Sequence, residues 1–183
     1  MEVQELSLPG LLLIRPDVYG DDRGHFMESY HRERLRDYGL DEDFVQDNES
    51  LSRQGTVRGL HFQAPPHAQG KLIRVPQGRV WDVALDVRAG SPTYGQWHGV
   101  ELSGSNFLQL YVPPGMAHGF AVLEPRTLFQ YKCSAYYYQA AEGGVRWDDP
   151  DLAIEWPIEN PIISEKDRQQ PFFREFQSPF TYA

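Results

Sequence analysis

Short segments in which apolar and polar residues alternate, separated by turn residues, constrain the fold of this chain more than any other feature. In VWDVALDV (residues 80–87), every second residue from Trp81 to Val87 is apolar, and these residues alternate with Asp82, Ala84 and Asp86. This is the period of a half-buried β-strand, whose other face meets water. The 16 glycines and 14 prolines punctuate the chain throughout, and no long stretch repeats apolar residues at the helix period. The sequence therefore predicts an all-β protein.

Three further segments have the same strand-like character: Lys71–Val75, Asn106–Val112 and Thr127–Cys133. One short helix is predicted over Arg32–Tyr38, ended by Gly39. Many short strands at close spacing are typical of an antiparallel sandwich or barrel. We expect a double-sheet jelly-roll barrel with a few short helices. The length of 183 residues suits one domain over residues 1–183.

Charge and cysteine content limit the partners and the compartment. The formal net charge is −9 and no run of Lys or Arg occurs, so we expect no nucleic-acid partner, because long polyanions need many neutralising cations. The single cysteine excludes an internal disulfide framework and suits a reducing compartment. We expect neither a signal peptide nor a membrane span in the N-terminal segment MEVQELSLPGLLLIRP, because its apolar run is short. We expect a cytoplasmic protein that does not bind membranes.

Two polar residues share a strand face with apolar neighbours. Lys71 alternates in phase with Ile73 and Val75, and Tyr131 with Phe129 and Cys133. A Lys on an apolar face is costly unless it has a partner or a task, although an edge-strand Lys can also extend to water. For the tyrosine, a core position with one hydrogen bond is the simpler interpretation.

The segment VRGLHFQ (residues 57–63) contains a histidine that could exchange a proton near neutral pH. Taken alone, a histidine in a strand is more often a structural hydrogen-bonding residue than a base. Strict alternation sends Arg58 and His61 to opposite faces. Because Gly59 lies between them, a local twist or bulge there would bring both toward one cavity.

A tight turn, PPGMAHG (residues 113–119), ends in His118. Its Pro-x-Gly-x-x-His spacing resembles the second half of the metal-binding signature of cupin barrels. The first half normally supplies two His and a Glu. Here it would be His61-Phe-Gln63, which lacks the second His, and no Glu follows within reach. We expect the barrel without the metal.

Two segments near the N-terminus offer groups for a phosphorylated ligand. YGDDRGHFMES (residues 19–29) combines Arg23, Phe26 and Glu28 beside a glycine-rich turn. A guanidinium binds phosphate bidentately and an aromatic face stacks on a base, although a hairpin with solvated charges explains the same pattern. FVQDNES (residues 44–50) adds the amides of Gln46 and Asn48.

Taken together, these segments resemble the dTDP-4-dehydrorhamnose 3,5-epimerase family. The resemblance runs from about Pro16 to Phe172 and is carried by GDDRGHF (20–26), FVQDN (44–48), VRGLHFQ (57–63), QGKL (69–72), DVALD (82–86), GSPTYG (90–95), PPGMAHGF (113–120), YK (131–132) and ISEKD (163–167). It implies a cupin-type jelly roll that works as a homodimer without metal or other cofactor. It also implies conversion of dTDP-4-dehydro-6-deoxy-D-glucose to dTDP-4-dehydro-L-rhamnose.

The resemblance also implies a role for each matching residue. His61 would be the base, held by Asp167, with Lys71 next to the ketone oxygen and Tyr131 delivering a proton from the other side of the sugar, chiefly at carbon 5. The residues expected to contact nucleotide, diphosphate or sugar are Arg23, Phe26, Glu28, Gln46, Asn48, Arg58, His118, Glu142 and Lys166.

Three other functions compete with this interpretation. An epimerase of the same family that inverts only carbon 3, or only carbon 5, can keep the same base and lysine; the presence of Tyr131 favours double inversion. A metal-dependent cupin oxygenase would need the missing His-x-His segment. A non-catalytic cupin that only binds a sugar nucleotide would keep the fold without proton exchange.

Overall fold

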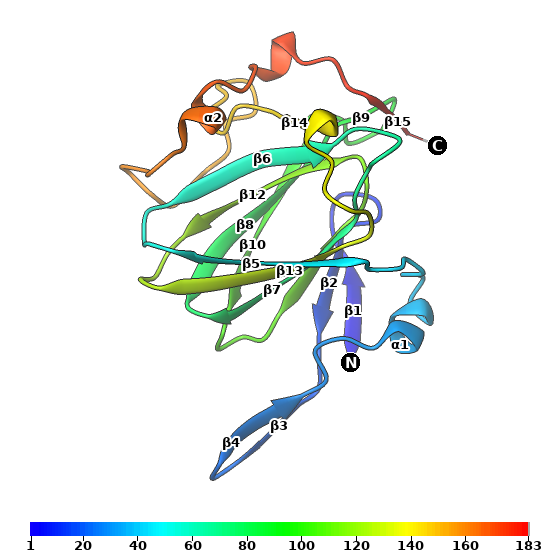
Figure 1. Cartoon of the computed structure of the whole chain (residues 1–183), viewed down its shortest axis with the longest axis vertical. Helices are drawn as coiled ribbons and strands as arrows, with labels where there is room; N and C mark the ends of the chain where they lie inside the picture. The colour runs from blue at the N-terminus through cyan, green and yellow to red at the C-terminus, as the bar shows by residue number, and fades with distance from the viewer. Residues whose placement is uncertain (183) are drawn as a thin grey trace.

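The computed structural model describes residues 1–182, which form two antiparallel sheets facing each other, as Figure 1 shows. The six-stranded sheet has the order β1 (Glu2–Glu5), β2 (Leu12–Arg15), β11 (Gln109–Val112), β7 (Lys71–Gln77), β13 (Thr127–Cys133), β5 (Gln46–Ser52). The five-stranded sheet has the order β10 (Trp97–Ser103), β8 (Arg79–Asp86), β12 (Met116–Val122), β6 (Val57–Gln63), β14 (Glu142–Gly144). This architecture confirms the predicted double-sheet jelly roll.

The remaining elements are short. β3 (Val18–Asp21) and β4 (Gly24–Met27) form a hairpin, and β9 (Arg88–Ala89) pairs in parallel with β15 (Phe180–Thr181). The helices are α1 (Arg32–Arg36), α2 (Glu165–Arg168) and two 3₁₀ turns, η1 (Gln139–Ala141) and η2 (Phe173–Glu175). Among residues 1–182, no helix has both the length and the apolar character needed to cross a membrane.

The main core lies between the two sheets. It is built from inward-facing apolar side chains of both, including Ile73 and Val75 of β7, Ala84 of β8, and Phe120 and Phe129, whose rings stack with centroids 3.9 Å apart. Alternation along each strand places these residues on one face. Lys71 shares this face of β7 with Ile73 and Val75 and therefore points toward the interior, as the alternation along the strand predicts.

The prediction that residues 80–87 form a half-buried strand was wrong. β8 lies in the middle of its sheet and is buried on both faces. Its outer face, with Val83 and Leu85, packs beneath the segment that follows β14, including Leu152 and Phe180. In Figure 1 this segment crosses the top of the molecule. Asp82, which lies between Trp81 and Val83 and was expected on the solvent face, therefore faces the interior and has no exposed surface.

Some element boundaries differ from those predicted. The helix ends at Arg36 instead of Tyr38, followed by a turn to Gly39. The strand predicted from Asn106 starts only at Gln109, because the Asn106 side chain accepts hydrogen bonds from the backbone of Ser103 and Leu108 and holds a turn there. The strand over Thr127–Cys133 has its predicted bounds.

Candidate active site

A cavity of about 570 Å³ opens between the two sheets. Residues from both walls and from α2 line it. All four residues expected to be catalytic contribute, together with three of those expected to bind substrate: His61, Lys71, Tyr131, Asp167, Arg58, His118 and Lys166.

His61 and Asp167 form a close pair in this cavity. Nε2 of His61 lies 2.5 Å from Oδ1 of Asp167, and the side chains are 28% and 5% exposed, respectively. Ser164 caps the N-terminus of α2 by accepting the backbone N–H of Asp167 at 3.1 Å. Two backbone hydrogen bonds between Ile162 and residues 55 and 57 attach the preceding segment beside β6. Tertiary pairing thus carries the acid to the histidine.

The carboxyl of Asp167 is held in its ionised form. Burial raises its pKa, but hydrogen bonds and the charge of His61 more than offset that effect, so the pKa lies below its usual range. An ionised carboxylate can only accept, so Nε2 of His61 carries the hydrogen of this bond. The other ring nitrogen, Nδ1, is then the basic one.

A register shift in β6 brings Arg58 and His61 to the same cavity. The pairing of β6 with β12 slips between His118 and Phe120, at the level of Gly59, whose φ is +127°. A side chain at Gly59 would meet Cα of Gly119 at 2.5 Å. The bulge predicted from the parity of the strand is confirmed, and it needs glycine both for its backbone conformation and for close packing.

Lys71 reaches across the cavity from β7. Its Nζ lies 3.4 Å from the backbone carbonyl oxygen of His61, so the two residues face each other. Burial lowers the pKa of Lys71, while the charges of nearby acids act in the opposite direction. A cation in this position faces any group that enters beside His61.

Tyr131 lies on the six-stranded sheet, across the cavity from His61. Burial is the main reason that its pKa is raised, which keeps the phenol protonated. Cross-strand pairing places Asn48 of β5 opposite Tyr131. Gln46 donates to Asn48 at 3.0 Å and accepts the backbone N–H of Tyr137 at 2.9 Å. Neither Gln46 nor Asn48 is among the residues that line this cavity.

Glu142 and Lys166 connect the cavity rim to the helix that carries Asp167. Nζ of Lys166 lies 2.5 Å from Oε1 of Glu142, and the hydroxyl of Tyr137 donates to Glu142 at 2.9 Å. Burial raises the pKa of Glu142, but its interactions with Lys166 and Tyr137 lower the pKa by more than burial raises it. The pKa therefore lies below its usual value. Glu142 and Lys166, both expected to bind substrate, are therefore already paired with each other.

His118 brings a buried carboxylate into the site that the sequence interpretation missed. Its Nε2 lies 2.9 Å from Oδ1 of Asp82 on the neighbouring strand β8. Asp82 was predicted only as the polar alternate of a half-buried strand. One feature of the sequence could have indicated a role for Asp82: it is an acid within a mostly apolar strand, and burying a charge there costs free energy.

Within residues 1–182, no three His, Cys, Asp or Glu side chains lie close enough together to hold one ion. His61 and His118 each pair with a separate carboxylate, Asp167 and Asp82 respectively.

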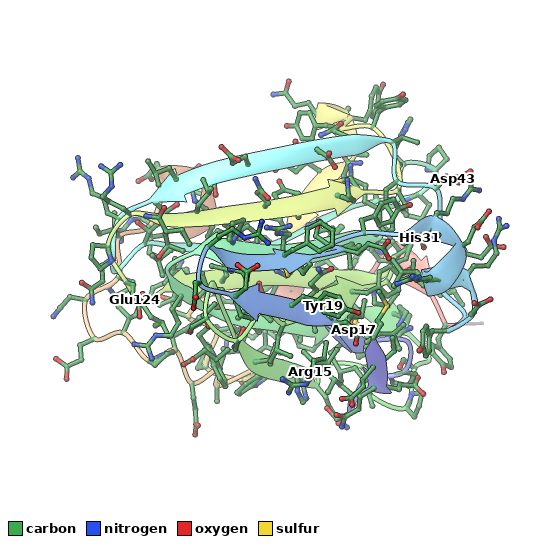
Figure 2. All side chains as sticks on the ribbon, turned by 90° about the horizontal axis from the view of Figure 1, so that it is seen from below. Arg15, Asp17, Tyr19, His31, Asp43 and Glu124 are labelled. Atoms are coloured by element: carbon green, nitrogen blue, oxygen red, sulfur yellow. The ribbon has the colours of Figure 1, made fainter. Side chains whose placement is uncertain are left out.

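Arg23, Phe26 and Glu28 are not brought to this cavity. Arg23 and Phe26 lie on the β3–β4 hairpin, which projects from the lower end of the molecule in Figure 1. Figure 2 views the hairpin from below, with Tyr19 labelled on it. Phe26 is 71% exposed, and Glu28 pairs with Arg34 at 3.0 Å. The hollow beside the hairpin is lined by hairpin residues alone.

Comparison with known proteins gives a consistent result. The family model described as dTDP-4-dehydrorhamnose 3,5-epimerase matches residues 5–175. The chain is 50% identical over 185 residues to the dTDP-4-dehydrorhamnose 3,5-epimerase of Sinorhizobium fredii, covering 100% of this chain and 95% of that protein.

Two solved structures are informative. The epimerase from Legionella pneumophila, in complex with dTDP-4-keto-L-rhamnose, superposes with a TM-score of 0.95 at 43% identity, covering 100% of this chain and 99% of that one. A 3'-monoepimerase from Streptomyces bikiniensis, in complex with dTDP-quinovose, superposes with a TM-score of 0.86 at 34% identity, covering 91% of this chain and 85% of that one. The similarity to 3,5-epimerases is thus both higher and more extensive. The chain therefore belongs to the dTDP-4-dehydrorhamnose 3,5-epimerase family.

Proposed function

We propose that this protein catalyses the 3,5-epimerisation of dTDP-4-dehydro-6-deoxy-D-glucose to dTDP-4-dehydro-L-rhamnose. The observation that carries the proposal is the His61–Asp167 pair facing Lys71 in one cavity. Membership of the family, and the bound dTDP-4-keto-L-rhamnose of the Legionella relative, support the substrate class.

Carbons 3 and 5 of the sugar both neighbour the ketone at carbon 4, so loss of a proton from either gives an enolate. His61 removes this proton through Nδ1, since Nε2–H is donated to Asp167. The carboxylate keeps that tautomer and stabilises the imidazolium that forms. Return of a proton to the opposite face of the carbon inverts it.

Lys71 and Tyr131 complete the reaction. The ammonium of Lys71 lies next to the carbon 4 oxygen and stabilises the negative charge as the enolate develops. Tyr131 belongs to the six-stranded sheet, opposite the sheet that carries His61, and its raised pKa keeps a proton available on that wall. We assign it delivery of the proton, chiefly at carbon 5. The side chains of Arg58, His118 and Lys166 are assigned to substrate binding around this centre.

We further propose that the protein is a homodimer in which the β3–β4 hairpin serves the partner's site. Arg23 and Phe26 present a guanidinium and an exposed ring suited to phosphate and base, but they lie on a hairpin that projects away from the cavity of their own chain. A second copy supplies the missing nucleotide contacts. Residues 1–183 act as one domain, and we keep the cytoplasm as the proposed location.

Proton NMR in heavy water tests the reaction. Incubation with dTDP-4-dehydro-6-deoxy-D-glucose is expected to introduce deuterium at carbons 3 and 5 and to yield the doubly inverted product. Label confined to carbon 3, or to carbon 5, would identify a mono-epimerase instead. Absence of any exchange, with dTDP still bound, would leave the protein a non-catalytic sugar-nucleotide binder.

A further inference from the structure

Asp82 is a buried carboxylate inside the barrel that the mechanism above does not use. It has no exposed surface, and its Oδ1 accepts a hydrogen bond from Nε2 of His118 at 2.9 Å. Its second oxygen, Oδ2, is buried and has no hydrogen-bond partner within residues 1–182. A half-satisfied charged group in a core is expensive, so its presence there calls for a function.

The first consequence of Asp82 concerns His118. Burial lowers the pKa of His118 despite the neighbouring carboxylate, so the ring is neutral at physiological pH. Because Asp82 as a carboxylate can only accept, the ring's hydrogen sits on Nε2 and Nδ1 is an acceptor. His118 lines the cavity, and Nδ1 makes no hydrogen bond to any described residue. The ring is thus held ready to accept a hydrogen bond from a ligand.

The second consequence concerns Lys71. Nζ of Lys71 lies 3.4 Å from the backbone carbonyl oxygen of His61, and His61 pairs across the sheet with His118, the hydrogen-bond partner of Asp82. Burial lowers the pKa of Lys71, and three nearby groups oppose that effect: Cys133, Asp82 and Glu142, in decreasing order. Burial also raises the pKa of the Cys133 thiol, which is therefore neutral and contributes no charge near pH 7. Glu142 is already paired with Lys166. Asp82 is the remaining buried anion that acts on the lysine.

We propose that Asp82 is a positioning residue of the epimerase site, which fixes the tautomer of His118 and supplies the negative charge that keeps Lys71 protonated. The proposal rests on the proposed function, because a charged Lys71 matters only if an enolate forms beside it. Asp82 reaches the substrate through these two side chains and does not line the cavity itself.

The test is the pH dependence of kcat/KM for deuterium exchange at carbon 3, which reports protonation states of the free enzyme. Exchange at carbon 3 is chosen because Tyr131 is assigned chiefly to carbon 5. The titratable groups that face Lys71 are His61, Asp82, His118, Tyr131, Cys133 and Glu142. Measuring the exchange in a Tyr131→Phe background ensures that titration of the phenol does not contribute to the alkaline part of the pH profile.

Asp82→Asn removes the negative charge that opposes the effect of burial on Lys71, so the pKa of Lys71 falls further. The alkaline limb of the plot of kcat/KM against pH, where Lys71 loses its proton, then moves to lower pH by about one unit. At a pH above that limb, kcat/KM drops about tenfold relative to the parent. Asp82→Glu keeps the charge and is expected to retain the parental limb even if its rate is lower. Asp82→Ser removes the charge without adding bulk and repeats the test if the asparagine variant does not fold.

Asp86→Asn is the matched control. Asp86 is equally buried on the same strand, but its oxygens are engaged by Arg88, Ser91 and Thr93, and it does not line the cavity. Its replacement is expected to lower stability without moving the alkaline limb. A folded Asp82→Asn enzyme with the parental limb would overturn the proposal, as would failure of both charge-removing variants to fold. Absence of exchange in the wild-type enzyme would reject the proposed function instead.

Discussion

Nε2 of His61 lies 2.5 Å from Oδ1 of Asp167, although 106 positions separate the two residues along the chain. The segment before α2 pairs with the backbone at residues 55–57, and Ser164 caps the helix so that Asp167 faces β6. One edge of the barrel thereby holds the acid against the base. Removing either member of the pair tests the proposed chemistry most directly.

Asp167→Asn is expected to lower kcat by about 10²–10⁴-fold, because an amide no longer fixes the tautomer of His61 or stabilises the imidazolium. His61→Ala should abolish deuterium exchange at both carbons while dTDP binding, measured by calorimetry, persists. Glu165→Gln is the matched control, since Glu165 is on the same helix but exposed, and within residues 1–182 its side chain is hydrogen-bonded only to Gln169. An Asp167→Asn enzyme with wild-type kcat would refute the assignment.

Tyr131→Phe is expected to separate the two inversions. The variant retains the buried ring and its packing against Phe129, whose centroid lies 5.9 Å away, but it has no hydroxyl proton to deliver. Exchange at carbon 3 should continue at much of its normal rate, and little doubly inverted product should form. Proton NMR of the products in heavy water measures both. Equal loss at the two carbons would contradict the role given to Tyr131.

Mixing two inactive variants tests whether the hairpin serves the partner's site. Arg23→Ala lacks the hairpin guanidinium and His61→Ala lacks the base. In a statistical mixture, half of the dimers contain one of each chain and have one intact site, so roughly a quarter of all sites become active. Activity should appear only after co-refolding or subunit exchange. If the hairpin serves its own chain, the mixture stays inactive.

Exhaustive chelation is expected to leave turnover unchanged, because the proposed proton transfers use His61 and Tyr131 and the enolate is stabilised by Lys71. Dialysis against EDTA followed by elemental analysis establishes the metal content, and the epimerisation rate is compared before and after. A loss of activity that a divalent cation restores would instead support the metal-dependent cupin alternative.

Gly59→Ala is expected to destabilise the fold by about 2–5 kcal/mol. The new Cβ would lie 2.5 Å from Cα of Gly119 at a φ of +127°, so overpacking adds to backbone strain. Gly24→Ala is the matched control, because Gly24 has a φ of +129° with nothing within 4 Å of the added carbon, and it should cost only about 1 kcal/mol. Urea unfolding measures both. Equal losses would show that packing against Gly119 is unimportant.

The sequence alone was sufficient for the fold class and for the direction of several side chains. Alternation along β7 and β13 decided which residues face inward, because the period of a strand is a local property of the backbone. The inward lysine and the bulge at Gly59 were predictable for the same reason. Local turns such as the one at Asn106 were not, since a side-chain hydrogen bond replaced the strand there.

Only the tertiary structure decided which distant groups meet. Alternation cannot show that both faces of β8 are covered, so Asp82 was expected in water and lies instead against His118. Nor can it show that the hairpin with Arg23 and Phe26 projects away from the cavity of its own chain. Such contacts depend on which strands pair and on what packs over them, and both are set by burial summed over the whole chain.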